Sequence, residues 1–333
     1  MQFVPYEELA GTPNVIVDGS GGADTVLTLS HWPGSRTTES LQADLSAEIV
    51  IRYLQQPALH VDVDAVSNNH FDEDGLMGVF ALVEPTTALA QKELLIDVAR
   101  AGDFGWSHTR DGARISFAIS TLVDPEVTPL DRSLFQGEYP KVAAARYRAL
   151  LPRVPELLAD VDRFESLWAE EDAHLTASEA AIDAGRVTIA ERPDLDLAIV
   201  EVHEPLDERT MHRFTQRRSA GLHPMAVHNR TNVTRVAYVC DRRYEVQLRY
   251  ETWVQLVSRT PLPRVDLGVL GSRLDELETS GGSWQFDGVG AITPALTMRH
   301  GSESSIGPAE FLDELYSFLS TAPAAWDPWS PRA

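Results

Sequence analysis

The stretch SNNHFDEDGLMGVF, residues 67–80, places one histidine and three acids within five positions, ahead of a glycine and an apolar run. Carboxylates this close repel one another, so an ordinary surface loop gains nothing from them. In an extended segment alternate side chains point the same way, which predicts that His70, Asp72 and Asp74 share one side. One imidazole and two carboxylates suit a divalent ion such as Mn²⁺, Fe²⁺ or Zn²⁺. Gly75 is expected to let the chain turn sharply into a helix.

A helix cap is the alternative explanation for these acids. Asp74 would cap a helix that begins at Leu76, and the other acids would simply favour its N-terminus. This accounts for one or two acids but not for His70 or for the alternation, so the pattern favours a metal site.

Further ligands are expected at other strand ends. Asp18 ends the apolar run VIVD, His31 ends VLTLSH, and Asp103 follows a helical pattern in VARAGDFGW. Each signal is weak alone, because an Asp at a strand end often forms a turn and a lone His is usually structural. Ligands in open α/β sheets bind outside the carboxyl ends of strands, where such residues meet.

Strands that alternate with helices position these residues. The pattern predicts an α/β fold with an N-terminal parallel sheet that has helices on both faces. The expected strands are residues 14–19, 25–32 and 59–69, and the expected helices are residues 38–56, a helix starting within 75–83, and 87–104.

The chain is expected to have three parts. Residues 1–125 form the metal-binding catalytic domain, the Ala-, Leu- and Glu-rich residues 126–185 form a helical connector, and residues 186–333 form a smaller α/β substrate-binding domain. In the last part we expect strand hairpins within 186–202 and 235–259. Helices are expected near 266–279 and 308–320.

Composition narrows the functional classes. The 333 residues carry a net charge of −22, which argues against a protein that wraps long nucleic acid but not against a small phosphorylated substrate. A single cysteine, Cys240, excludes an intramolecular disulfide. Neither a signal peptide nor an apolar run long enough to span a membrane is recognisable, so we expect a cytoplasmic protein.

The motifs resemble those of the DHH phosphoesterase superfamily. HFDEDG fits its first motif, H-x-D-x-D-G, at every fixed position, and LIDVARAGDF resembles its fourth. VIVDG is similar to the second motif and VLTLSHWPG to the third, but both precede HFDEDG, as in a circular permutation. The Asp-His-His of the third motif is here Ser30-His31-Trp32, and Trp32 cannot contact a phosphate as the second histidine does in that family.

The resemblance implies a cofactor and a mechanism. Two divalent ions, Mn²⁺ first among them, would activate a water for attack on phosphorus. Asp18 would bridge the ions, with His70 and Asp72 completing one site. Asp74, His31 and Asp103 would complete the other, and the expected catalytic residues are Asp18, His31 and Asp74.

Substrate binding is expected in the C-terminal part, where arginines gather between residues 230 and 259. Arginine suits phosphate or carboxylate groups, and the candidates are Arg249, Arg259 and His228. The alternative is that these arginines pair with glutamates on a solvated sheet face. The family's small domain often has a Gly-Gly-Gly-His loop, and TSGGSWQFDG here carries Trp284 near the expected histidine.

The sequence is compatible with three functions. The first is a metal-dependent phosphoesterase acting on a small or short phosphorylated substrate. The second is a metal-dependent hydrolase or lyase of specialised metabolism on another substrate class, which Trp32 and Trp284 favour. The third is a non-catalytic relative with a vestigial cluster. The expected partner is a small molecule, with a homodimer as a further option and no membrane.

Overall fold

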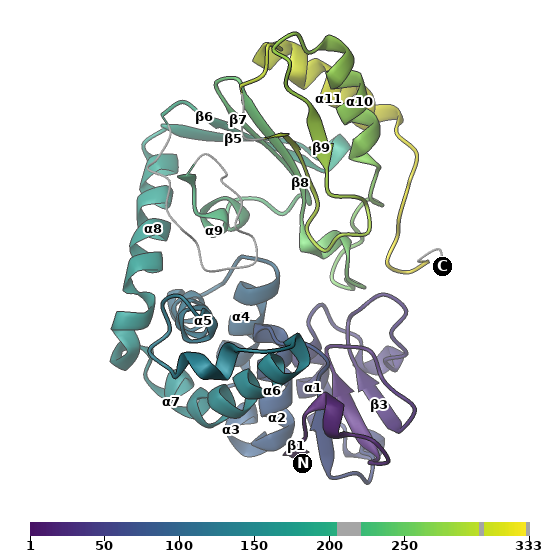
Figure 1. The fold of residues 1–333 in the computed structure, drawn as a ribbon. Coiled ribbons are helices and arrows are strands. Elements are labelled where there is room, and N and C mark those ends of the chain that lie inside the picture. The colour runs from purple at the N-terminus through teal and green to yellow at the C-terminus, as the bar shows by residue number, and fades with distance from the viewer. Residues whose placement is uncertain (205–220, 300–302, 331–333) are drawn as a thin grey trace. The chain divides into compact units, whose positions relative to one another are not determined.

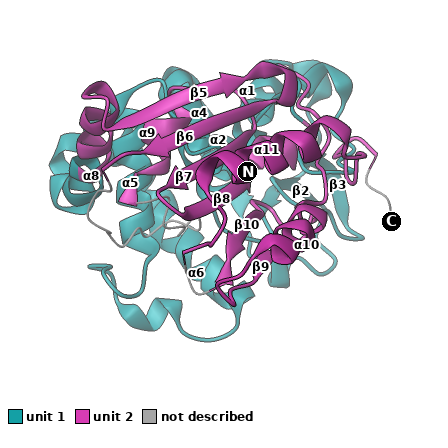
Figure 2. Cartoon of the chain, turned by 90° about the horizontal axis from the view of Figure 1, so that it is seen from above, with its two compact units in different colours: residues 1–173, 256–258 teal, residues 174–255, 259–333 magenta. Residues whose placement is uncertain are grey.

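The computed structural model describes residues 1–204, 221–299 and 303–330 (Figure 1). The chain divides into two compact units (Figure 2). Unit 1 comprises residues 1–173 and 256–258, and unit 2 comprises residues 174–255 and 259–333. The division therefore falls within one long helix, and most of the expected connector belongs to unit 1 rather than to a separate part.

Unit 1 is built on a parallel sheet of four short strands in the order β1-β4-β2-β3. Its strands are β1 (Gln2–Phe3), β2 (Asn14–Val17), β3 (Thr25–Leu29) and β4 (Ala65–Ser67). Its helices are α1 (Ser46–Leu54), α2 (Glu73–Val83), α3 (Pro85–Ala90), α4 (Lys92–Asp103), α5 (Arg110–Val123), α6 (Tyr139–Leu150) and α7 (Val154–Ala159), and α8 (Glu165–Asp183) begins in this unit.

Helices α1 and α2 pack together and contact the strands, and α4 packs on α2. The contact with β2 is close at Gly78 of α2, where an added Cβ would come within 2.5 Å of Val17 Cγ1. Ile16 forms a separate apolar cluster with Leu9 and Ala65. Because successive side chains of a strand alternate, Ile16 and Val17 serve opposite faces of the sheet.

Unit 2 contains a mixed sheet of six strands in the order β5-β6-β7-β8-β10-β9. The strands are β5 (Val187–Arg192), β6 (Leu197–Val202), β7 (Arg235–Cys240), β8 (Arg243–Leu248), β9 (Trp284–Phe286) and β10 (Ala295–Met298). The helices are α9 (Pro224–His228), α10 (Leu267–Leu277) and α11 (Pro308–Thr321). One face of the sheet packs against α10 and α11, and the other packs against α9 and the end of α8 (Figure 1).

The predicted fold class is confirmed, including the antiparallel hairpins β5–β6 and β7–β8. Several predicted boundaries of helices and strands were wrong. The helix expected over 38–56 begins only at Ser46, and the strand expected over 59–69 is limited to Ala65–Ser67. The helix expected over 87–104 is two helices, because the backbone departs from helical geometry at Gln91. Helix α5 had no sequence-based prediction.

No helix among the described residues combines the length and the apolar content that crossing a bilayer requires.

Candidate metal centre

Three adjacent strands deliver the predicted ligands to one edge of the sheet. Strands β4, β2 and β3 are neighbours and run parallel, so their carboxyl ends lie together. Asp18 directly follows β2, His31 follows β3 by two residues, and His70 follows β4 by three. Segments far apart in sequence therefore meet because of the strand order.

Asp18 lies at the centre of the cluster. Its φ of 50° places it in the left-handed region, which Asp tolerates better than most residues and which ends β2 abruptly. Its Oδ1 lies 3.3 Å from His31 Nε2, and its Oδ2 lies 3.2 Å from His70 Nε2. The two oxygens of one carboxylate therefore face two different imidazoles.

The cluster contains two groups that have the geometry to hold a metal ion. In each group the candidate ligand atoms lie within 4.8 Å of one another. One group is Asp18, His70 and Asp72, and the other is Asp18, His31 and Asp74. Asp18 belongs to both, which is the arrangement expected of a bridging carboxylate.

Asp72 and Asp74 reach the cluster by different routes from the one expected. Helix α2 begins at Glu73, so Asp72 is its N-cap and accepts a hydrogen bond of 2.8 Å from Gly75 N. Asp74 lies in the first helical turn rather than in an extended segment, so the predicted strand-like alternation is wrong at this point. The helical turn nevertheless directs Asp74 inward and sends Glu73 to Ser116 of α5.

Asp74 also explains where α1 begins. Its two carboxylate oxygens accept hydrogen bonds of 2.7 Å from Ser46 N and Ala47 N, the first amides of that helix. Asp74 is therefore a helix cap, as the alternative hypothesis held, but it caps α1 rather than its own helix. A carboxylate at a helix N-terminus is favourable because the unpaired amides and the helix dipole are positive there.

Asp103 completes the set from the end of α4. Its Oδ2 lies 3.5 Å from His31 Nε2. Asp103 is the last residue of α4 rather than a loop residue. Among the described residues none donates a hydrogen bond to Asp103 Oδ2 or to Asp18 Oδ2, although both atoms are buried. Buried carboxylate oxygens without a donor are costly unless a cation compensates them.

Burial and mutual repulsion raise the pKa of most of these carboxyl groups. Burial and the charge of Asp18 raise the pKa of Asp74 to about 7. Burial and the charges of the neighbouring carboxylates raise the pKa of Asp103 well above its ordinary value, and burial raises the pKa of Asp72. Asp18 is the exception, since burial favours a higher pKa but contacts with His31 and His70 lower it below the ordinary value.

The pKa values of both imidazoles are raised as well. Burial would lower the pKa of His31, but Asp18 and Asp74 outweigh burial and raise that pKa to about 9. The pKa of His70 also rises well above its ordinary value despite burial, because of Asp72 and Asp18. The carboxylates thus attract positive charge strongly, and protonated imidazoles supply part of it.

Sequence reasoning missed the residues that orient the ligands. His31 Nδ1 lies 2.6 Å from the carbonyl oxygen of Asp44, which fixes the ring and leaves Nε2 facing the acids. The Ser46 hydroxyl donates to Asp18 Oδ1 at 2.6 Å. A serine just before an apolar periodic run is a helix-start signal. The sequence could therefore have predicted that α1 begins at Ser46.

The predicted substrate residues lie in unit 2. Arg249 is buried, forms a 2.5 Å ion pair with buried Glu251, and donates to the carbonyl oxygen of Thr231. Arg259 also approaches Glu251, at 3.5 Å, and is partly exposed. His228 is the last residue of α9 and is partly buried. The contacts of Arg249 match the alternative of arginine–glutamate pairing, inside the unit rather than on a solvated face.

Trp284 belongs to the core of unit 2. It begins β9, and its ring stacks on Phe311 at a centroid distance of 5.7 Å. With an exposed fraction of 6% it is a packing residue rather than part of a substrate loop.

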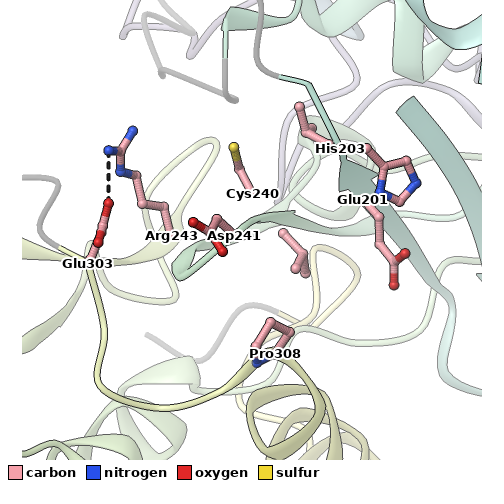
Figure 3. A pocket seen from close by; sticks show the side chains of 9 residues that line it. Glu201, His203, Cys240, Asp241, Arg243, Glu303 and Pro308 are labelled. Atoms are coloured by element: carbon pink, nitrogen blue, oxygen red, sulfur yellow. Dashed lines mark hydrogen bonds and ion pairs between the residues drawn. The ribbon is translucent and has the colours of Figure 1, made fainter. Parts of the chain in front are cut away.

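Unit 2 also contains a pocket of about 530 Å³ that none of the predicted residues line (Figure 3). It lies where β6 and β7 end, and its wall includes His203, Cys240 and Asp241. Arg243 and Glu303, on one side of it, form a 3.1 Å ion pair with each other. The lining carries both signs of charge and defines no ligand class.

A comparison with protein families gives one match, to DUF6687, a family of unknown function, over residues 1–330. The chain belongs to DUF6687. Curated proteins and solved structures yield no match. The DHH resemblance and the roles of the six ligands therefore stay predictions for this DUF6687 chain.

Proposed function

We propose that unit 1 binds two divalent cations, Mn²⁺ first among them, and hydrolyses a small phosphorylated substrate. The observation that carries the proposal is the shared use of Asp18 by two groups of three candidate ligands. When bound, a pair of divalent cations would stabilise phosphoryl charge and lower the pKa of a water.

Charge balance supports two cations rather than one. Four buried or half-buried aspartates, Asp18, Asp72, Asp74 and Asp103, converge with two imidazoles. Two divalent cations would neutralise four carboxylates with both imidazoles in their neutral, metal-binding form. Burial of the same acids without compensation would be expensive.

The two groups differ in access to solvent. The side chains of Asp18, His31 and Asp74 are 0% exposed, whereas those of His70 and Asp72 are 18% and 22% exposed. The substrate would therefore reach the cluster beside His70 and Asp72. In this proposal Asp18 would hold both cations. His31, Asp74 and Asp103 would hold the buried one, and His70 and Asp72 would hold the open one.

Trp32 favours a second candidate, a metal-dependent hydrolase or lyase of specialised metabolism whose substrate is not a phosphodiester. Its ring lies over that of His70, with a centroid distance of 4.9 Å and an interplanar angle of 35°. An aromatic ring at the open side suits a planar or apolar substrate group better than a bare phosphate.

The test is a substrate screen with the full chain, with and without Mn²⁺. Phosphodiesters, phosphomonoesters and pyrophosphate represent the first candidate, and carboxylic esters and amides represent hydrolysis under the second. We expect Mn²⁺-dependent hydrolysis of a phosphorylated substrate that Asp72→Ala abolishes with the fold intact. Asp62→Ala removes an exposed acid that precedes β4, so it is the control for the loss of one negative charge and should retain full activity. Mn²⁺-dependent turnover that survives Asp72→Ala would refute the site assignment.

A further inference from the structure

Ser46 contacts three of the six proposed ligands. It is the first residue of α1 and is fully buried. Its hydroxyl donates to Asp18 Oδ1 at 2.6 Å, its amide donates to Asp74 Oδ2 at 2.7 Å, and its Oγ accepts from His31 N at 3.3 Å. The first amides of α1 are capped by Asp74, so the Ser46 side chain is not needed to cap its own helix.

The direction of the hydroxyl hydrogen is fixed by its partners. A serine has one hydroxyl hydrogen, the His31 amide is itself a donor, and a carboxylate is an acceptor. The hydrogen therefore points at Asp18 Oδ1, and the resulting charge-assisted bond is short and buried. Ser46 itself is held in place by the amide bonds of α1 to Asp74.

We infer that Ser46 is a positioning residue that keeps Asp18 in a bridging orientation, an inference that rests on the proposed two-cation function. The torsion of a carboxylate about its Cβ–Cγ bond is soft and has broad minima. The Ser46 bond restricts this rotation with Oδ1 on the His31 side, which leaves Oδ2 on the His70 side. A freely rotating Asp18 would instead be able to turn both oxygens toward one cation.

Loss of the Ser46 hydroxyl should therefore weaken cation binding more than it destabilises the fold. Removal of a hydrogen-bond partner behind a metal ligand typically weakens metal affinity about 10- to 100-fold. We expect Ser46→Ala to weaken binding of one of two Mn²⁺ ions by about that factor. Ser46→Thr keeps the hydroxyl and should restore binding.

The experiment is Mn²⁺ titration of the full chain by calorimetry, with electron paramagnetic resonance of the loaded protein. Two Mn²⁺ ions that share a carboxylate are magnetically coupled and give a spectrum unlike that of isolated ions. The wild-type chain should show coupling, Ser46→Ala should lose it, and Ser46→Thr should regain it. Ser120→Ala, a buried serine of α5 that donates to Glu73, is the matched control and should keep the coupled spectrum.

The outcomes separate the two claims. A wild-type chain that binds no Mn²⁺ overturns the proposed function and this inference with it. A coupled pair in both the wild type and Ser46→Ala overturns the role of Ser46 and leaves the proposed function standing. If Ser46→Ala does not fold, Ser46→Cys replaces it, because a thiol of similar size is a weak donor.

Discussion

Neutralisation of Asp74 should stabilise the metal-free protein and remove part of its stabilisation by metal. In the fold the pKa of this carboxyl is about 7, against 3.8 for an ordinary aspartate, because of burial and the charge of Asp18. A raised carboxyl pKa means that ionisation destabilises the fold, and the loss of stability develops as the pH rises from 3.8 through 7. At pH 8 the cost is about 4 kcal/mol, from 1.36 kcal/mol for each unit of pKa.

Asp74→Asn removes this cost because an amide does not ionise. It also weakens the cap of α1, since Asp74 accepts from both Ser46 N and Ala47 N and an Asn oxygen replaces only one acceptor. The lost hydrogen bond costs about 1–3 kcal/mol. The expected net effect in chelator at pH 8 is stabilisation by about 1–3 kcal/mol.

With Mn²⁺ present, the wild-type chain should be more stable than Asp74→Asn. A ligand at 100 times its dissociation constant stabilises the folded state by about 2.7 kcal/mol per site. The wild-type chain should gain this stabilisation, and Asp74→Asn should lose the part that depends on the His31 side of the cluster.

The assay is urea unfolding followed by hydrogen exchange of unit 1 amides, with either EDTA or Mn²⁺ present. Asp97→Asn is the matched control, because Asp97 is a buried acid of unit 1 that accepts from His108 N and Thr109 N outside the cluster. It should lose stability equally in both conditions. The reasoning is refuted if Asp74→Asn is destabilised in EDTA as much as the control, or if it keeps the full stabilisation by Mn²⁺.

Three other substitutions test separate parts of the structure. Gly75→Ala would place a methyl carbon 2.3 Å from Asn68 Nδ2. We therefore expect a loss of about 1–3 kcal/mol of stability in urea unfolding and weaker Mn²⁺ binding in calorimetry. Unchanged stability and affinity would contradict this close contact between Gly75 and Asn68. Arg249→Met leaves the buried Glu251 with only the more distant Arg259 and should cost up to about 3–5 kcal/mol in urea unfolding, whereas a raised KM with unchanged stability would indicate a substrate contact instead. Burial favours a higher pKa for Glu278, but serine hydroxyls and amides lower it from 4.5 to about 2. Its ionised form therefore stabilises unit 2 above pH 4.5 and loses this effect toward pH 2. Glu278→Gln should flatten the fall of the urea midpoint over that range, and an unaltered slope would argue against the assignment.

The sequence predicted the cluster because the ends of strands can be recognised in it. Apolar runs that stop at Asp18 and His31, and the acids that follow His70 closely, are local patterns, and a parallel sheet brings the ends of its strands together. The fold class followed from the same alternation of strands and helices.

The remaining features depend on contacts between distant segments. The cap that Asp74 provides for α1 joins residues 28 positions apart, so no local rule identifies Asp74 as the cap of that helix. Arg249 lies just beyond the end of β8, and its burial with Glu251 arises from the packing of the chain after that strand. A count of arginines in the sequence cannot distinguish a buried ion pair of this kind from a binding surface.

Crystals of the full chain soaked in Mn²⁺ and measured at the manganese absorption edge test the central claim most directly. We expect two anomalous peaks about 3.5–4 Å apart, one on either side of the Asp18 carboxylate. One peak should contact His31 and Asp74, and the other His70 and Asp72. Crystals that show no peak at Asp18, or a single ion bound elsewhere, would contradict it.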